Sequence, residues 1–346
     1  MAYGRTYSSH AMAVELVDVF GHQLAASRLG PGQLCLCITD SAWNPAYAAA
    51  CMGAAHALGA DAYQVVFPVN RPLPGKTLAA SWVEADLIVY MTSFTLHYRP
   101  EIRAALDAGA RVLCAMQPVH VMTRLTADPD VRRRTIAGAA LLDAATIIRI
   151  TSDAGTDLVM DKTGRRGLAH YGAADEPGHL DFWGAGMAQA AQLEGTLEGR
   201  LVLDRGDCCF HLGRFMEQPT TIVFERGRAV AFEGGLDALL IRTALEAGGT
   251  DSAFMAGHMA WGTDHRAQWL QPLVQVPDAG GGGADSESFY GNVQIEIGSN
   301  NDVVFGGQNA ASVHLGLCLR NASLWLDGTP IIARGEFVPA LLRRRG

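Results

Sequence analysis

Two histidines and one glutamate in the second half of the chain are the residues best suited to metal chemistry. His258 stands in Gly-His-Met-Ala-Trp-Gly, Glu296 in Asn-Val-Gln-Ile-Glu-Ile-Gly, and His314 follows Gly-Gly-Gln-Asn-Ala-Ala-Ser-Val. Two imidazoles and one carboxylate are the ligands of mononuclear non-haem Fe(II) sites, which keep positions open for substrate and O2. If the three side chains converge, we expect a metal enzyme, with an oxygenase as the first hypothesis. The same ligands also suit Zn, Mn or Co.

The segments around these residues indicate how each is presented. Residues 293–297 alternate apolar and polar, which predicts a strand with Gln294 and Glu296 on one face. That face could be exposed to solvent or line a cleft, and the pattern leaves both open. His314 leads into the apolar run 315–319, and a histidine entering a buried strand needs a partner for its ring nitrogens. A metal ion is one such partner.

Two further groups could contribute to a site. His97 and Tyr98 follow an expected strand, and loops at the carboxyl ends of parallel strands bind ligands in α/β proteins. We expect both to act as acid/base or hydrogen-bonding groups.

Residues 170–183 contain a dense run with His170, His179 and Trp183. This run could border a substrate pocket or form an ordered surface loop pinned by its tryptophan. We expect His179 to be catalytic and His170 and Trp183 to contact substrate. Trp261 could provide a wall for a flat aromatic ring.

The first 150 residues alternate between strand-like and helix-like segments. Expected strands are 33–39, 62–69, 86–92 and 111–116, and expected helices are 11–29, 45–58 and 100–108. This rhythm predicts an α/β fold whose N-terminal domain, residues 1–150, is a Rossmann-like, open and mainly parallel sheet. No Gly-x-Gly-x-x-Gly follows the first strand, so a dinucleotide cofactor is not expected.

Residues 151–346 predict a β-rich α+β domain that carries the metal site. Residues 151–175 are polar and loop-like, and Asp327-Gly328 marks a hairpin turn. The glycine-rich segment 279–285 predicts either a mobile flap or a solvated linker. The expected strands are 201–203, 220–224, 229–232, 292–297, 303–305 and 323–326, with a helix over 237–247.

Composition excludes several classes of function. The net charge of −8 argues against nucleic acid as a partner. No run reaches roughly 18 apolar residues, and the N-terminus lacks an apolar leader, so we expect no membrane span and a cytoplasmic protein. The seven cysteines form no Cys-x-x-Cys, and neither Gly-x-Ser-x-Gly nor His-Glu-x-x-His occurs.

Several longer motifs together resemble those of a known family. They are Pro-Gly-His-Leu-Asp-Phe-Trp at 177–183, Glu-Gly-Thr-Leu-Glu-Gly at 194–199, Leu-Val-Leu-Asp at 201–204, Phe-Glu-Gly-Gly-Leu-Asp-Ala at 232–238, His-Met-Ala-Trp-Gly at 258–262, Gly-Gly-Gln-Asn at 306–309 and Leu-Trp-Leu-Asp-Gly at 324–328. With these motifs the chain resembles the 2,5-dihydroxypyridine 5,6-dioxygenases, which are related to thermophilic-type metal aminopeptidases. The resemblance runs from about residue 11 to residue 340.

The resemblance implies specific roles for some of these residues. It implies an Fe(II) held by His258, by a hydroxyl residue near Glu296, and by a His-x-Asp at His314, with His97 in catalysis. Here Gly316 replaces the aspartate of that motif. A relocated site with Glu296 as its carboxylate is consistent with this departure, and so is loss of the metal.

The first expectation is therefore an Fe(II)-dependent, extradiol-type ring-cleaving dioxygenase acting on a small hydroxylated N-heteroaromatic substrate such as a dihydroxypyridine. A ring-opening amide hydrolase or an aminopeptidase-like hydrolase, with or without iron, is the alternative. A catalytically inactive binding relative is a third. The family resemblance also implies a homo-oligomer.

Overall fold

The computed structural model describes residues 9–69, 76–269, 284–301 and 306–345. Their contacts form two units. Among the described residues, unit 1 holds 9–69, 76–127 and 172–184, and unit 2 holds the remainder. The strand expected at 303–305, and all but the last two residues of the segment 279–285, lie outside the described residues.

Unit 1 is built on a five-stranded sheet in which every neighbouring pair is parallel. This confirms the expected open parallel sheet. The strand order is β2-β1-β3-β4-β8, with β1 Leu34–Asp40, β2 Asp61–Phe67, β3 Leu87–Met91, β4 Arg111–Cys114 and β8 Leu180–Phe182. The short β8 joins the sheet from a segment far along the chain.

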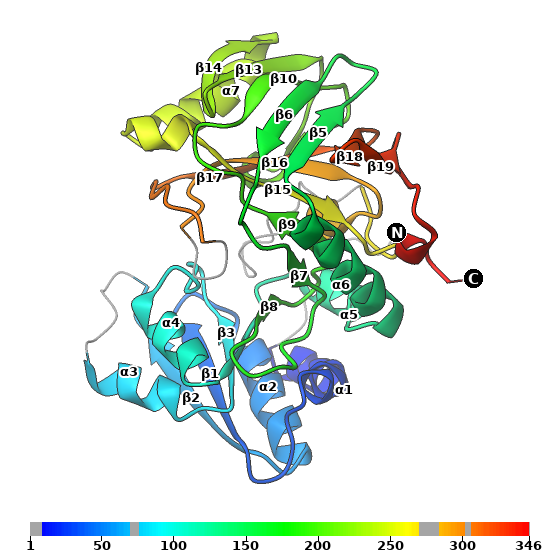
Figure 1. Ribbon diagram of the computed structural model, residues 1–346. Coiled ribbons are helices and arrows are strands. Elements are labelled where there is room, and N and C mark those ends of the chain that lie inside the picture. The colour runs from blue at the N-terminus through cyan, green and yellow to red at the C-terminus, as the bar shows by residue number, and fades with distance from the viewer. Residues whose placement is uncertain (1–8, 70–75, 270–283, 302–305, 346) are drawn as a thin grey trace. The chain divides into compact units, whose positions relative to one another are not determined.

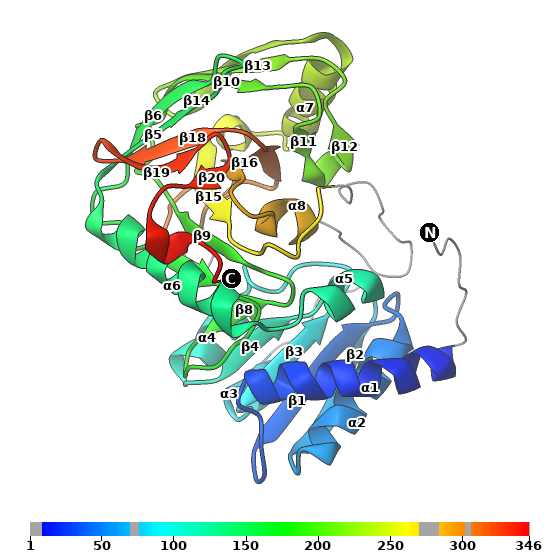
Figure 2. The ribbon, with the colours of Figure 1, turned by 90° about the vertical axis from the view of Figure 1, so that its right-hand side faces the viewer.

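The helices of unit 1 cover both faces of this sheet. They are α1 Ser9–Ala26, α2 Pro45–Ala57, α3 Lys76–Val83, α4 Pro100–Asp107 and α5 Val119–Arg124. Figures 1 and 2 show α1 and α2 on one side of the sheet and α3 and α4 on the other. The start of α2 follows from its sequence, because Pro45 occupies the first turn and the Asn44 side chain accepts a hydrogen bond from the Ala46 N–H.

Unit 2 consists of two antiparallel sheets with three α-helices among its described residues, which confirms a β-rich second part. The eight-stranded sheet has the order β14-β13-β10-β6-β5-β18-β19-β20. Its strands are β5 Ile147–Thr151, β6 Asp157–Asp161, β10 Glu198–Leu203, β13 Thr220–Glu225, β14 Arg228–Glu233, β18 Ser323–Leu326, β19 Thr329–Ala333 and β20 Glu336–Phe337. The expected Asp327-Gly328 turn joins β18 to β19.

The seven-stranded sheet has the order β12-β11-β17-β16-β15-β9-β7. Its strands are β7 Leu168–His170, β9 Met187–Ala190, β11 Cys208–Cys209, β12 Arg214–Phe215, β15 Ala256–Gly262, β16 Val293–Gly298 and β17 His314–Leu319. The helices of unit 2 are α6 Pro129–Ala144, α7 Gly235–Glu246 and α8 Ala284–Ser288, with 3-10 turns η1 Phe210–Leu212, η2 Asp251–Phe254 and η3 Ala340–Leu342.

Two expectations differ from this arrangement. Residues 151–175 are not a loop, because they contain β6 and β7. In β6 the buried side chains Leu158 and Met160 alternate with exposed ones and enter the core. The boundary expected at residue 150 also differs from the contact division, because α6 packs against β7 and β9 and therefore belongs to unit 2.

The main hydrophobic core of unit 2 draws side chains from both sheets. Ile148 and Leu201 of the eight-stranded sheet belong to the same buried cluster as Ile295 and Leu317 of the seven-stranded sheet. Because side chains alternate along a strand, Glu296 and its neighbours on the other face of β16 point away from this core. No helix among the described residues is long and apolar enough to cross a membrane.

Candidate metal centre

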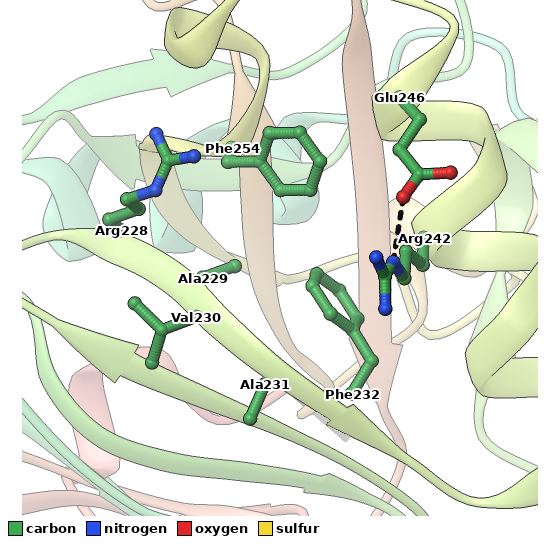
Figure 3. Close-up of a pocket in the computed structure, with 8 residues that line it drawn as sticks. All are labelled: Arg228, Ala229, Val230, Ala231, Phe232, Arg242, Glu246 and Phe254. Atoms are coloured by element: carbon green, nitrogen blue, oxygen red, sulfur yellow. Dashed lines mark hydrogen bonds and ion pairs between the residues drawn. The ribbon is translucent and has the colours of Figure 1, made fainter.

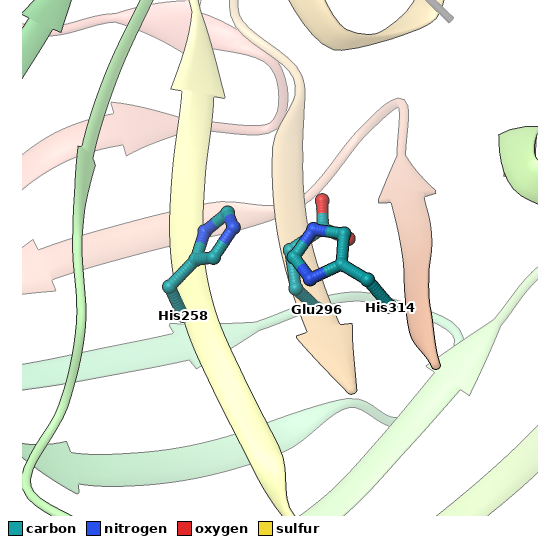
Figure 4. A group of neighbouring side chains, drawn as sticks. All are labelled: His258, Glu296 and His314. Atoms are coloured by element: carbon teal, nitrogen blue, oxygen red, sulfur yellow. The ribbon is translucent and has the colours of Figure 1, made fainter. Parts of the chain in front are cut away.

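Three adjacent strands of the seven-stranded sheet bring His258, Glu296 and His314 together. β15, β16 and β17 each contribute one of the three side chains, which point toward a common centre in Figure 4. One potential ligand atom from each residue lies within 4.8 Å of the other two. Antiparallel pairing of the three strands thus brings together residues that lie up to 56 positions apart in the sequence. The expected convergence is what the structure contains.

A β-bulge aims His258 at this centre. Ala256 pairs with Ile297 and Met259 with Ile295, so Gly257 and His258 together oppose the single residue Glu296. A side chain at Gly257 would crowd backbone carbonyls at the end of β16, with a Cβ only 3.2 Å from the Ser299 oxygen. Glycine before the histidine therefore permits the close approach of the two strands.

The ring of His314 is held in one orientation. Its Nδ1 lies 2.9 Å from the Ser299 carbonyl oxygen, which can only accept, so Nδ1 carries the hydrogen. Its Nε2 lies 3.5 Å from Glu296 Oε2 and has its lone pair available on that side. The rings of His258 and His314 stack with centroids 5.2 Å apart. This tautomer is the one a metal-binding histidine needs at Nε2.

Burial controls the protonation of all three residues. It is the main cause that raises the pKa of Glu296 well above its usual value, followed by the nearby Glu287. Burial, followed by the proximity of His314, lowers the pKa of His258 well below its usual range. Burial likewise lowers the pKa of His314. Without a cation the site therefore favours two neutral imidazoles and a protonated carboxyl group.

Gly316 is enclosed by the side chains around it. A Cβ built at this position would lie 1.9 Å from Phe210 Cε1 and 2.6 Å from Glu296 Oε2. The space in which a residue 316 side chain would project is thus filled by the Phe210 ring and by the Glu296 carboxylate.

A hydrogen-bond network behind the centre links the two histidine segments. Asn300 Nδ2 donates to the Gly257 carbonyl and to Glu194 Oε1, each at 3.1 Å, and its Oδ1 accepts from the Asn309 N–H at 2.8 Å. The side chain of Asn309 in turn donates to the Gly298 carbonyl at 2.6 Å. Asn300 is fully buried. The network therefore fixes the residue before His258 relative to the turn that precedes His314.

Glu194 anchors this network as an ionised carboxylate. Burial acts to raise its pKa, but hydrogen bonds from the Gln308 N–H and from Asn300, with the charge of Arg165, lower the pKa overall. Arg165 pairs with Glu194 at 2.6 Å. Glu194 belongs to a motif used in the family resemblance, and its place here gives that motif a structural role.

His211 lies beside the centre and has no counterpart among the expected site residues. Its Nδ1 accepts a hydrogen bond from the Gly316 N–H at 2.8 Å, and its ring meets that of His314 edge-on at 5.4 Å. The side chain is exposed on its open side. Desolvation of the ring by the protein packed around it, followed by the proximity of His314, lowers the pKa of His211 to about 3. Neutral His211 agrees with its role as an acceptor. Its sequence context, Cys-Cys-Phe-His-Leu-Gly, carries no metal-site spacing.

The expected substrate contacts in unit 2 are both buried. His170 is 3% exposed and close enough to His258 to influence its pKa. Trp261 is fully buried in the hydrophobic core and packs against Gly138 of α6. A ring in that position supports the sheet and presents no open face to a substrate.

The remaining expected residues belong to unit 1. Trp183 is fully buried, meets Phe20 edge-on, and donates its Nε1–H to the Met122 carbonyl, so it acts as a core residue. His179 lies 3.6 Å from both Asp175 and Asp181.

His97 and Tyr98 form a turn between β3 and α4, and their rings lie 4.4 Å apart. His97 Nδ1 is 3.0 Å from the hydroxyl of Tyr90, which is fully buried on β3, and its ring meets Phe182 edge-on. His97 is therefore a half-buried histidine whose orientation is fixed from two sides.

A separate cavity of about 290 Å³ in unit 2 has different chemistry (Figure 3). Arg242 pairs with Glu246 at 2.7 Å, and Arg228 pairs with Asp251 at 3.0 Å and lies over the Phe254 ring. The charged groups that line this cavity are thus already neutralised by one another or by a neighbour. None of the three metal-site residues lines it.

Comparison with known proteins gives concordant matches. A family model described as 2,5-dihydroxypyridine 5,6-dioxygenase matches residues 15–339. A 2,5-dihydroxypyridine 5,6-dioxygenase of Pseudomonas putida is 30% identical over 341 residues, covering 94% of this chain and 96% of that protein. The solved 2,5-dihydroxypyridine dioxygenase of Pseudomonas putida matches with a TM-score of 0.88 and 28% identity, covering 96% of this chain and 99% of that one. Wild-type AmpT from Thermus thermophilus matches at a TM-score of 0.63 and 14% identity, covering 95% and 100%, which shows the fold alone.

Proposed function

Because the chain belongs to the 2,5-dihydroxypyridine 5,6-dioxygenase family, as its motifs indicated, we propose that it is an Fe(II)-dependent enzyme that opens the ring of a dihydroxypyridine with O2. The observation that carries this proposal is the convergence of His258, Glu296 and His314 within 4.8 Å. A dihydroxypyridine is the substrate class in the names of the relatives. Three protein ligands leave room for both substrate and O2.

The residues present fit a small divalent cation. Glu296 is 1% exposed, and among the described residues its Oε2 accepts no hydrogen bond. A buried carboxylate oxygen without a partner is costly unless a positive charge lies close to it. The two neutral imidazoles supply lone pairs and bring no competing positive charge. This ligand set therefore both attracts a cation and suits Fe(II).

Bound Fe(II) would supply the redox chemistry that lets O2 react with an aromatic ring. The protein's own tasks are ligation and proton handling. His314 keeps Nε2 available because Ser299 holds its Nδ1–H, and Glu296 provides the negative charge. His97 acts as the acid/base group that exchanges a proton with a substrate hydroxyl group. Tyr90 orients His97 through the 3.0 Å contact with its Nδ1.

Oxygen consumption by the anaerobically purified, Fe(II)-loaded protein tests the proposal. With 2,5-dihydroxypyridine we expect one O2 consumed per ring lost, and one iron bound per chain. His314→Ala and Glu296→Gln should abolish turnover. His97→Ala should lower the rate about 10²–10⁴-fold, the usual contribution of a general acid/base.

The exposed His56 on α2 provides a matched control, and His56→Ala should be as active as the wild type. Ring opening that proceeds without O2 would instead identify a hydrolase. Full activity of His314→Ala would refute the proposed centre.

A further inference from the structure

We propose that His211 is a substrate-orienting residue of this centre: a neutral imidazole whose Nε2–H donates a hydrogen bond to an oxygen atom of the bound substrate. This inference rests on the proposed function. It assigns a role to a residue that is neither one of the three ligands nor part of the Tyr90–His97 pair.

The position of His211 follows from how β11 ends. β11 pairs with β17 through Cys208–Cys318 and Cys209–Leu317. After Cys209 the chain turns into η1, so the next backbone group on β17, the Gly316 N–H, loses its strand partner. The His211 side chain replaces that partner, accepting the hydrogen bond at Nδ1. Its ring is thereby fixed against the strand that begins with His314.

Gly316 is required for this docking. The Phe210 ring, which lies tilted against the His211 ring with centroids 4.2 Å apart, occupies the position of a residue 316 side chain. Any Cβ at 316 would displace Phe210 and the turn that carries both rings. The glycine that replaces an expected aspartate is therefore also what brings a third histidine to the centre.

The hydrogen bond from Gly316 determines which nitrogen of His211 carries the hydrogen. A backbone N–H can only donate, so Nδ1 holds a lone pair and the neutral ring carries its hydrogen on Nε2. His314 has the opposite tautomer, with its hydrogen on Nδ1 and its lone pair at Nε2. The two neighbouring rings are thus prepared for different tasks, one to bind a cation and one to donate a hydrogen bond.

This tautomer excludes two other roles. To bind the metal through Nε2, His211 would have to move its hydrogen to Nδ1 and break the bond with Gly316. To act as a base it would need a lone pair at Nε2, which it lacks for the same reason. A donor next to a cation is suited to an electron-rich oxygen, and both hydroxyl oxygens of a dihydroxypyridine are of that kind. Unlike His258 and Glu296, which are buried, His211 is exposed and accessible to a small molecule.

Two substitutions separate this role from a structural one. Asparagine places its Oδ1 where histidine has Nδ1, so His211→Asn keeps the acceptor for Gly316 and removes the donor. Glutamine places its amide nitrogen near the position of Nε2, so His211→Gln keeps a donor and removes the acceptor. If His211 has only a structural role, His211→Asn should bind substrate more tightly than His211→Gln. If it orients the substrate, His211→Gln should bind substrate more tightly than His211→Asn.

The measurement is the dissociation constant of 2,5-dihydroxypyridine for the anaerobic Fe(II)-loaded protein, with KM and kcat alongside. We expect His211→Asn to weaken binding about 10- to 100-fold, the effect of losing one hydrogen bond to a charged or strongly polar group. His211→Gln should stay within a few-fold of the wild type. Iron affinity should be unchanged in both. The penalty in His211→Asn should vanish for either 2-hydroxypyridine or 3-hydroxypyridine, whichever lacks the contacted oxygen.

The outcomes distinguish this inference from the function on which it rests. Wild-type protein that neither binds nor oxidises a dihydroxypyridine overturns the proposed function and this role together. Normal wild-type turnover with unimpaired binding in His211→Asn overturns only the role of His211. The role of His211 is also overturned if His211→Asn loses affinity for iron in proportion to its loss of affinity for substrate. That result would make His211 a metal ligand or a support of the ligands.

Discussion

Glu296 and Gly316 lie directly opposite each other on the antiparallel strands β16 and β17. Opposed residues of such a pair have their Cβ positions about 4.5–5.5 Å apart on the same face of the sheet. A carboxylate carried by either residue therefore reaches the same region beside His314. The family motif expects its carboxylate at position 316, and here the only carboxylate of the pair comes from position 296. In the proposed centre, a carboxylate on the neighbouring strand would thus take the place that the resemblance assigns to an aspartate at position 316.

This opposition predicts that Gly316→Ala damages the centre. The added methyl group would lie 1.9 Å from Phe210 and 2.6 Å from Glu296 Oε2, so both side chains must move. Overpacking of this kind typically costs about 1–3 kcal/mol. We expect a loss of that size in the free energy of unfolding, together with iron affinity lowered at least tenfold, measured by urea denaturation and metal titration.

Two further variants show whether crowding is the cause. Gly316→Ala combined with Phe210→Ala should recover part of the iron affinity, since the nearest obstacle is gone. Gly21→Ala in helix α1, where a Cβ meets nothing within 4 Å, should be neutral or stabilising by up to about 1 kcal/mol. Wild-type iron affinity in Gly316→Ala would contradict the crowding of Glu296.

A second prediction concerns Asn300, whose amide group holds the two histidine segments together. Asn300→Asp has the same shape but places an oxygen against the Gly257 carbonyl and against the ionised Glu194, which accept the hydrogens of Nδ2. Leaving a buried acceptor opposite two other acceptors, with no hydrogen to share, costs about 1–3 kcal/mol of folding stability. We expect that loss in the free energy of unfolding and weaker iron binding, because the residue before His258 is displaced.

Asn321 provides the matched control, since it is exposed in the turn after β17. Asn321→Asp adds the same charge to unit 2 and should change stability by less than about 0.5 kcal/mol. Equal effects of the two substitutions would show that added charge, not the lost hydrogen bonds, is responsible.

The sequence patterns predicted the parallel sheet well and the centre in part. Apolar runs separated by alanine-rich helices place β1, β3 and β4 correctly, because strands buried on both faces have a strong signal. Alternation around Glu296 predicted its strand but not its environment. The solvent-facing alternative was wrong, because every residue of β16 is buried. The alternation of residue types shows which side chains share a face of the strand, but it does not show what packs against that face.

Other features depend on pairing between distant segments, which local patterns do not contain. β8 has three residues and joins the parallel sheet only through its register with β4. His211 reaches the centre because β11 pairs with β17 and then ends, so its role depends on a strand of two residues. The two tryptophans were expected at a substrate because of their type, and burial in the two cores explains them instead.

A third prediction follows from the raised pKa of Glu296. In the metal-free protein this carboxyl group stays protonated from its ordinary value of 4.5 up to its higher folded-state pKa. Metal ligands must be deprotonated, so cation binding in this range must release a proton. The pKa values of His258 and His314 are lowered from the ordinary 6.5, so above pH 6.5 both imidazoles are neutral and release none. Metal affinity should therefore fall as the pH falls, by about tenfold per unit below the pKa of Glu296.

Calorimetric titration with metal in buffers of different ionisation enthalpy measures this release directly. Where both imidazoles are neutral and the pH lies below the pKa of Glu296, we expect about one proton released per ion, declining toward zero as the pH rises through that pKa. Glu296→Gln should bind metal more weakly and release no proton above pH 6.5, where both imidazoles are neutral. The same raised pKa means that metal-free wild type loses stability as the pH rises above 4.5, since the unfolded chain ionises first, and Glu296→Gln should lack this loss. Proton release that persists in Glu296→Gln would assign the titrating group to another residue, because the carboxamide has no proton to give up.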